Sequence, residues 1–430
     1  ISMIKRMTIW LTIGVLLLCG CAPQTIAKEE TMSEEVNLTE PLATDNSATA
    51  APTDEIVQSA APDALAQFAC ALLGQALETS GNNPVVSPLS AYLALSMAAS
   101  GADGITKNEF STLLHGDPET LNDVCGALLA SLQKTNGSTK LTIANSVWSD
   151  ESANIQKSYL TLLKDVYAAD AFSAQLNSDK TRNAINAWVK EKTNGLIPTL
   201  RKDNYADDTM LVLLNTLYLN AKWDNPFWGQ MTEDHDFIKA DGTKVSSPFM
   251  NDRECHRDYL SIDGAEGILL PYDDGKTAFV ALMPTDTRTA RELATALTAE
   301  TLAAAIASRA EAFMNLSLPK FAVDFTLDMN DPLKKLGLTS AFNPNSADFS
   351  KMGSSAQGNL FLSSVQQIVK IIVDEKGTEA AAVTEIAAAG MALNPEQPRE
   401  LMFDHPFVYA VVDLDSGAPL FIGVLDEPQA

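Results

Sequence analysis

Apolar and polar positions follow two different periods along this chain, helical at first and then mostly strand-like. Between Leu65 and Leu77 apolar side chains recur every three or four residues, which predicts an amphipathic helix. Ser87-Pro88 predicts a second helix start, with serine at the cap and proline at the first helical position. The same spacing predicts further helices at 106–114, 120–133, 157–167, 179–192 and 288–309.

Strand-like apolar runs predominate later in the chain. They lie at 141–148, 211–219, 278–283, 313–323, 361–373, 407–413 and 420–425. Asp415-Ser416-Gly417 predicts a tight turn that joins the last two runs as a hairpin. Helices followed mostly by strands, without a repeat or an internal linker, predict one large α+β domain over residues 62–430.

One polar residue interrupts the most apolar of these runs. Asn215 shares a strand face with Leu213 and Leu217, because alternate residues of a strand point the same way. A buried amide without partners costs about 1–3 kcal/mol. We therefore expect Asn215 to have hydrogen-bond partners elsewhere in the chain.

The segment after the run 361–373 is rich in alanine, yet its charges do not fit a simple helix. Glu379 and Glu385 are six residues apart, so both lie on one face of an extended chain. Small or uncharged residues occupy the other face, namely Thr378, Ala380, Ala382, Thr384, Ile386 and Ala388. The pattern predicts a segment that can become a strand with one buried face, joined through the flexible Gly377 to the preceding strand.

The sequence Glu-Lys-Gly-Thr-Glu-Ala-Ala-Ala at 375–382 closely resembles the hinge of the reactive-centre loop in serpins, the serine-protease inhibitors. Similar family motifs occur at 83–90 (Asn-Pro-Val-Val-Ser-Pro-Leu-Ser) and at 214–227, and His405-Pro406-Phe407 fits as well. The resemblance runs from about Pro62 to the C-terminus. It implies the serpin fold, with three β-sheets, surrounding helices and an exposed reactive-centre loop at about 375–402.

The resemblance also implies a function that uses no catalytic residue of this protein. A serine protease cleaves the loop and becomes acylated, and the freed arm then inserts into the main sheet and carries the protease along. The usual spacing from the hinge puts the reactive bond between Met391 and Ala392, with Leu393 as the alternative cleavage residue because the following segment is longer than in common serpins. The hinge residues are Glu375, Gly377, Thr378, Ala380, Ala381, Ala382 and Val383.

The residues near Met391 indicate the kind of target. Methionine is long, apolar and flexible, and small residues precede it, so elastase-, subtilisin- and chymotrypsin-like proteases are the expected targets. Trypsin-like enzymes are disfavoured, because Arg399 is the only basic residue nearby.

Two further groups of residues are implied by the resemblance. Ser87 and Ser90 would lie beside Asn215 under the middle of the main sheet, in the region called the shutter. Gln367 stands there where the family often has histidine, so we expect no imidazole titration at this place. At the sheet entrance, called the breach, Trp223 would pack beside the loop and Lys320 would pair with Glu375.

The N-terminus predicts export. Lys5 and Arg6 precede an apolar run from Met7 to Leu18 that is short for a transmembrane helix, as in a signal peptide over residues 1–20. Leu18-Cys19-Gly20-Cys21 resembles the lipobox of bacterial lipoproteins, which implies lipidation of Cys21; the alternative is an ordinary signal peptide.

Residues 21–61 would then be a disordered acidic tether. Eight acidic residues and one lysine lie between residues 28 and 58. The predicted product is an exported lipoprotein, held at the cell surface or membrane through its lipid alone, which faces the extracellular space or the periplasm.

Composition excludes several other functions. The net charge of −25, from 30 basic and 55 acidic residues, argues against nucleic acid and against a heparin-like polyanion as partner. Cys70, Cys125 and Cys255 are odd in number and far apart, which predicts free thiols with neither metal nor other cofactor. Only four histidines are present, without a GxSxG or HExxH motif, so the chain is not expected to be an enzyme.

The expected partners are serine proteases, bound covalently by a monomer. The rival function is that of a non-inhibitory serpin which acts as a cell-surface binding protein. Such members usually carry bulky, charged or proline residues in the hinge, and 378–383 is not of that kind apart from Glu379.

Overall fold

The computed structural model describes residues 36–37, 61–79, 81–132, 138–378 and 397–429. The chain divides into Ile1–Glu34 and Glu35–Ala430, and every element below belongs to the second unit. The predicted signal peptide, Cys21 and most of the tether lie outside the described residues. No helix in the described part of the chain is long and apolar enough to cross a membrane.

Most predicted helices form at or near the predicted positions. The α-helices are α2 (Ala61–Leu77), α3 (Pro88–Ser100), α4 (Gly104–Leu114), α5 (Pro118–Leu132), α6 (Lys157–Tyr167), α7 (Asp179–Lys192), α8 (Ala290–Ala296), α9 (Ala299–Ala307) and α10 (Asn330–Lys335). Two 3-10 turns occur at Gly229–Met231 and Ser340–Phe342.

One predicted helix is wrong in its extent, and the predicted start of another is confirmed in position but not in its capping. The single helix at 288–309 is two helices, because Leu297 is extended and the Thr298 side chain caps a new helix by accepting a hydrogen bond from the Thr301 amide. Ser87 occupies the N-cap position of α3 without capping it, since its hydroxyl donates to the Leu420 carbonyl at 2.8 Å instead.

The main sheet has seven strands in the described residues and contains the hinge. Its order is β1 (Val36–Asn37), β5 (Asp170–Ala174), β3 (Lys140–Asp150), β6 (Leu211–Lys222), β15 (Gly377–Thr378), β14 (Leu362–Asp374) and β12 (Phe321–Asp328). β6 and β14 run parallel, and β15 runs antiparallel to both. Val36–Asn37 pairs with Phe172 and Ser173 of β5, so this part of the predicted tether has a defined structure.

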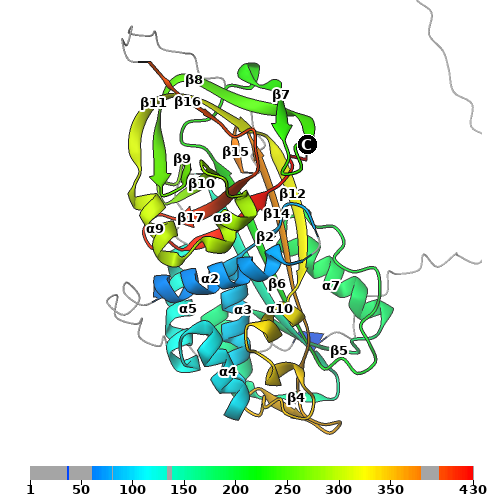
Figure 1. Cartoon of the computed structure of the whole chain (residues 1–430). Coiled ribbons are helices and arrows are strands. Elements are labelled where there is room, and N and C mark those ends of the chain that lie inside the picture. The colour runs from blue at the N-terminus through cyan, green and yellow to red at the C-terminus, as the bar shows by residue number, and fades with distance from the viewer. Residues whose placement is uncertain (1–35, 38–60, 80, 133–137, 379–396, 430) are drawn as a thin grey trace, which may run out of the picture. The chain divides into compact units, whose positions relative to one another are not determined.

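A second sheet has nine strands. It consists of β16 (Arg399–Met402), β11 (Ala310–Pro319), β8 (Lys244–Ile262), β9 (Ala265–Pro271), β10 (Thr277–Pro284), β17 (Phe407–Asp413), β18 (Pro419–Leu425) and β2 (Val85–Val86) in order, with β7 (Glu233–Ile238) beside β8. A third, small sheet pairs β13 (Gly353–Ser355) with β4 (Ala153–Ile155). The three sheets and the surrounding helices confirm the predicted α+β architecture (Figure 1).

The strand predictions fail where polar residues enter the strands. The run 313–323 is two strands in different sheets, β11 and β12, which separate at Lys320. The strands β7 and β8 have no apolar run, because many of their side chains are exposed and charged. Edge and surface strands carry little hydrophobic signal of their own.

The two faces of β6 are buried in two different apolar cores. Leu211, Leu213, Leu217 and Leu219 join the larger core, to which α3 also contributes. Val212 and Leu214 join a smaller core with Ile185, Trp188 and Val189 of α7 on the opposite face. Figure 1 shows α7 apart from the group of α2 to α5. The main sheet is thus covered on both faces near Val212 and Leu214, whereas Asn220, Lys370 and Ile372 on the α7 face are half-exposed.

Candidate functional site

The main sheet is parted along one seam, between β6 and β14. These strands pair directly only from Leu211 with Leu362 to Thr216 with Ile368. At the other end β15 lies between them, where Thr378 pairs with Ala221 of β6 and Val373 of β14. Between these pairings, the facing edges at 217–220 and 369–372 have no strand partner among the described residues. The seam is a place for one more strand, and β15 already occupies its first two positions.

The turn that leads into β15 is held by main-chain and side-chain hydrogen bonds. The Trp223 amide donates to the Lys376 carbonyl at 2.9 Å, and the Phe227 amide donates to the Glu375 carbonyl at 2.8 Å. The indole nitrogen of Trp223 donates to the Asp374 carbonyl at 2.8 Å. Trp223 therefore lies at the loop's entrance into the sheet and bonds to the end of β14 at Asp374 and to the turn at Lys376.

Lys320 and Glu375 meet at this entrance. The Lys320 Nζ lies 2.9 Å from a carboxylate oxygen of Glu375, and the Thr232 hydroxyl donates to the same carboxylate at 2.8 Å. Burial raises the pKa of Glu375, but the hydrogen bonds from Lys320, the backbone and Thr232 outweigh it, so the net pKa is lowered. Sequence reasoning missed Thr232, which lies in a polar loop without a distinguishing pattern.

Gly377 is required by both space and backbone conformation. Its φ of +150° is one that residues with side chains rarely adopt, and an added Cβ would lie 2.0 Å from the Ala221 carbonyl oxygen. A side chain here would force β15 away from β6. This glycine lets the hinge approach the neighbouring strand closely.

Thr378 is fully buried against an aromatic cluster. Its hydroxyl lies 2.6 Å from the Tyr272 hydroxyl, and both residues are 1% exposed. The Tyr272 ring stacks on Trp223, with centroids 4.8 Å apart and planes 7° apart. Burial raises the pKa of the Tyr272 phenol above its ordinary value, so the group stays neutral and able to donate.

The predicted shutter residues form two clusters rather than one. The Ser90 hydroxyl donates to the Asn215 side-chain oxygen, and the side-chain nitrogen of Asn215 donates to the side-chain oxygen of Asn145 at 2.6 Å. Gln367 instead bonds to the main chain of Ser87, where it accepts from the amide at 2.9 Å and donates to the carbonyl at 2.7 Å.

Sequence reasoning missed Asn145. It lies on β3 directly opposite Asn215 and is equally buried. The signal was a second asparagine in the run 141–148, but its register against 211–219 could not be read from the sequence.

The predicted reactive bond and most of the predicted hinge belong to the segment between β15 and β16. Ala380 to Val383, Met391, Ala392 and Leu393 lie outside the described residues. The chain resumes before β16, which pairs parallel with β11 from Arg399 with Met314 to Met402 with Ser317. The two described ends of the predicted loop are therefore strands of different sheets.

The three predicted thiols are free. Burial raises the pKa of Cys70 to about 11 and that of Cys125 to about 12, so both remain protonated and unreactive at neutral pH. The Nδ1 atom of His256 lies 3.1 Å from a carboxylate oxygen of Glu311. Among the described residues, no group of three histidine, cysteine or acidic side chains could hold a metal ion.

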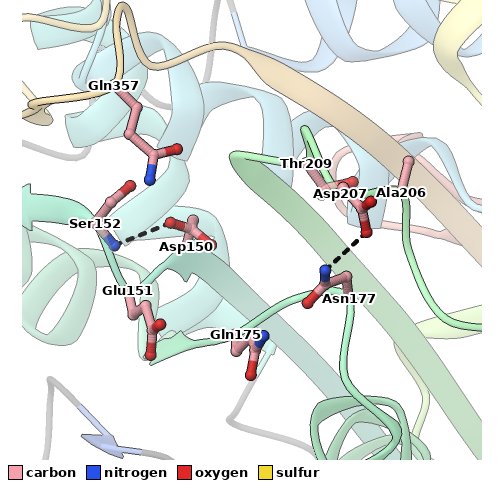
Figure 2. Close-up of a pocket in the computed structure, with 9 residues that line it drawn as sticks. All are labelled: Asp150, Glu151, Ser152, Gln175, Asn177, Ala206, Asp207, Thr209 and Gln357. Carbon is pink, nitrogen blue, oxygen red and sulfur yellow. Dashed lines mark hydrogen bonds between the residues drawn. The ribbon is translucent and has the colours of Figure 1, made fainter.

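Figure 2 shows a polar hollow of about 560 Å³ at the end of β3. Its lining consists of Asp150, Glu151, Ser152, Gln175, Asn177, Ala206, Asp207, Thr209 and Gln357. Asn177 donates to Asp207 at 2.8 Å, and the Ser152 amide donates to Asp150 at 2.9 Å. No histidine occurs among these described lining residues.

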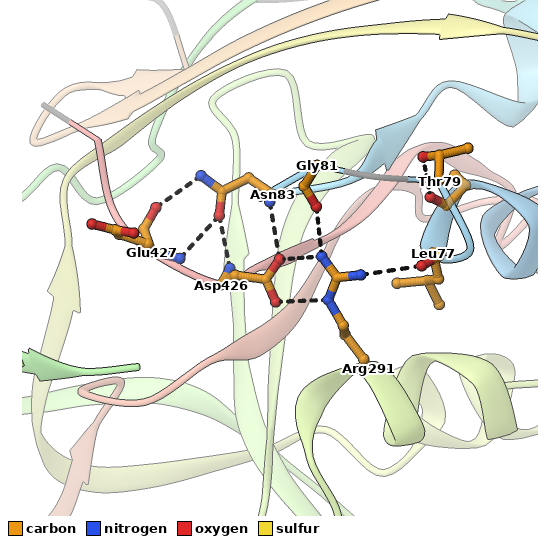
Figure 3. A network of polar contacts seen from close by, with 8 residues as sticks. Leu77, Thr79, Gly81, Asn83, Arg291, Asp426 and Glu427 are labelled. Atoms are coloured by element: carbon orange, nitrogen blue, oxygen red, sulfur yellow. Dashed lines mark hydrogen bonds and ion pairs between the residues drawn. The ribbon is translucent and has the colours of Figure 1, made fainter. Parts of the chain in front are cut away.

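A second polar cluster joins the C-terminus to the start of the domain (Figure 3). Arg291 forms an ion pair with Asp426 at 2.7 Å and donates to the carbonyls of Leu77 and Gly81. Asn83 accepts from the amides of Asp426 and Glu427 at 2.8 and 3.0 Å. These contacts satisfy one another's polar groups and join the two ends of the domain.

Comparison with known proteins agrees with this geometry. The family model described as serpin (serine protease inhibitor) matches residues 63–428. A relative from Triticum aestivum named Serpin-Z2A is 33% identical over 368 residues, which are 82% of this chain and 91% of that protein. A relative from Ixodes ricinus named Iris is 31% identical over 355 residues, with coverage of 81% and 93%.

Solved structures show the same fold. The native state of Tengpin, a thermophilic serpin, superposes with a TM-score of 0.83 at 31% identity and covers 91% of this chain and 99% of its own. Given this fold, the family model and the relatives together, the chain belongs to the serpin family, whose members are mostly protease inhibitors.

Proposed function

We propose that this chain is a suicide-substrate inhibitor of elastase-, subtilisin- or chymotrypsin-like serine proteases, cleaved after Met391. The observation that carries the proposal is the parted seam, in which β15 already pairs with β6 and β14 while the facing edges beyond it lack strand partners among the described residues. A strand that continued from Thr378 would pair along both edges. Side chains on one face of that strand would enter the larger core, while those on the other face would lie beside half-exposed residues such as Asn220 and Lys370.

The chemistry of the trap belongs to the protease. Its serine oxygen attacks the Met391 carbonyl carbon, the bond to Ala392 breaks, and the new amine leaves with a proton while Met391 stays as an ester on the serine. The freed arm from Glu375 to Met391 is about 50 Å long when extended, enough to cross a domain of this size. Insertion outruns hydrolysis of the ester and distorts the attached protease.

The energy for this movement is stored in the folded chain. Before cleavage the C-terminal end of the loop is held in β16 of the second sheet, which opposes insertion of the arm beyond β15. Cleavage frees one end, and the added strand gains hydrogen bonds and buried surface. The uncleaved form is therefore a kinetically trapped state.

We also propose that the protein is an exported lipoprotein anchored through Cys21. The sequence of residues 1–21 supports this: a basic start, a short apolar run and a cysteine after small residues. Two acyl chains would give stable attachment. The inhibitor would then protect the surface that carries it.

The test is to mix residues 60–430 with pancreatic elastase and to analyse the products by denaturing gel electrophoresis and mass spectrometry. A complex that survives denaturation, with a new N-terminus at Ala392, supports the covalent trap and its register. Cleavage without a complex would contradict the proposal and favour the non-inhibitory alternative, a binding protein of the cell surface.

A further inference from the structure

Tyr272 occupies a position that the motifs of the loop do not include. It follows β9 directly, in the second sheet, yet its hydroxyl reaches the first buried side chain of the hinge in the main sheet. Its main chain is held by contacts outside the hinge. The Tyr272 amide donates to the Thr277 carbonyl at 3.0 Å, and Tyr272 forms a bridge with Trp223. The main chain that carries the phenol is therefore anchored in the second sheet as well as at the hinge.

The hydroxyl pair is isolated from water. Tyr272 and Thr378 are each 1% exposed, and among the described residues each hydroxyl has the other as its hydrogen-bond partner. A buried hydroxyl that loses its partner is strongly disfavoured, whereas replacement of both partners by apolar groups of similar shape can be nearly neutral. The free-energy cost of replacing Thr378 by an apolar residue therefore depends on whether the Tyr272 hydroxyl is present.

We propose that Tyr272 is a positioning residue for loop insertion, which holds Thr378 as the first residue of the added strand. This deepens the inhibitory function proposed above and rests on it. Because the hydrogen bond from Tyr272 fixes the register of β15 between its neighbours, the arm begins insertion from its correct first position when the loop is cleaved. Early insertion favours the trapped complex over release of cleaved inhibitor, since both compete from the same acyl intermediate.

The structure supplies matched variants. Tyr272→Phe and Thr378→Val each remove one hydroxyl and leave the other buried without a partner, and the double variant removes both. Tyr409→Phe is the control, because Tyr409 is 0% exposed, lies in the second sheet and has a hydroxyl without a hydrogen-bond partner among the described residues.

The first measurement is hydrogen exchange in the full-length chain in detergent, without any protease. We expect the amides of residues 376–378 to exchange about two- to tenfold faster in each single variant. Exchange should return towards the wild-type rate in the double variant and stay unchanged in Tyr409→Phe. Unchanged exchange in Tyr272→Phe, or additive loss of protection in the double variant, would overturn the proposal.

The second measurement is the ratio of cleaved inhibitor to covalent complex with elastase. It should rise about two- to tenfold in each single variant and recover in the double variant. A ratio unchanged in Tyr272→Phe, with wild-type complex present, would overturn the role of Tyr272 alone. If the wild type forms no complex, the inhibitory function fails, while the exchange data still report whether Tyr272 positions the hinge.

Discussion

Lys320 and Glu375 form an ion pair of 2.9 Å at the mouth of the parted seam, between the strand break at the end of β11 and the turn into β15. Their side chains are 34% and 18% exposed, so solvent screens the pair and its contribution to stability is about 0–1 kcal/mol. The position of the pair matters more than this small contribution. The pair ties β14 and the loop entrance to the junction between two sheets.

Glu375→Lys should loosen the mouth of the seam. It places two lysines at one site and removes the acceptor used by Lys320 and Thr232. An opened seam can accept a loop from a second molecule, so we expect polymers after mild heating at conditions where the wild type stays monomeric. Native gels and light scattering would detect them. Glu375→Gln, which keeps the shape without the repulsion, is the control, and a Glu375→Lys protein that stays monomeric would contradict the expectation.

Acid should loosen the same place. The folded-state pKa of Glu375 is lowered from its ordinary value of 4.5, so its ionised form stabilises the hinge at neutral pH. This contribution is lost as the pH falls below about 4.5 through the folded-state pKa. Exchange of the 375–378 amides should therefore rise in acid, after correction for intrinsic rates. Glu375→Gln should remove that step, and an identical acid profile in both proteins would argue against this origin.

The sequence predicted the apolar parts of this fold better than its polar parts. The pattern placed β6, β14 and α7 almost at their observed bounds, because buried faces have a regular period. It missed β7 and β8, whose faces are largely exposed, and it joined β11 to β12 across Lys320. A change of sheet within a continuous apolar run is decided by tertiary packing and has no local signal.

The same division applies to the site. The small residues of the hinge can be recognised in the sequence alone, because the buried face of an inserted strand excludes charged side chains. Thr232, Asn145 and Tyr272 could not be found in that way, because each acts through a partner more than 60 residues distant in the sequence. Their roles depend on the register between strands, which the pattern of one chain does not give.

Thr378→Arg should convert the inhibitor into a substrate. Residue 378 is 1% exposed between β6 and β14, and a guanidinium there would be buried without a partner in place of the Tyr272 hydrogen bond. Elastase should cleave the loop with little or no complex on a denaturing gel. Thr378→Ser keeps the hydroxyl and should retain inhibition. Persistent covalent complexes with Thr378→Arg would contradict insertion through this position.

Asn215→Ala should destabilise the middle of the seam. It leaves Ser90 and Asn145 buried without their partner, at a cost of about 2–4 kcal/mol for the two groups. Chemical unfolding would measure the loss. Arg291→Ala, which breaks the distant cluster of Figure 3, is the reference for an ordinary loss of stability. Only Asn215→Ala should also increase polymerisation. Equal polymerisation in both variants would contradict the expectation that polymers form by opening of the seam.

Met391→Arg tests the cleavage register and the target range together. Trypsin-like enzymes require a basic residue at the cleaved position, and the wild-type chain has no basic residue between Lys376 in the hinge and Arg399. We expect Met391→Arg to form denaturation-resistant complexes with trypsin and to lose most of its activity against elastase, as measured by residual protease activity at increasing inhibitor ratios. Leu393→Arg is the matched variant for the alternative register. If it, rather than Met391→Arg, acquires trypsin inhibition, the arm is two residues longer and cleavage follows Leu393. If neither variant inhibits trypsin while both are cut at the new arginine, cleavage occurs without trapping, and the inhibitory function itself is contradicted.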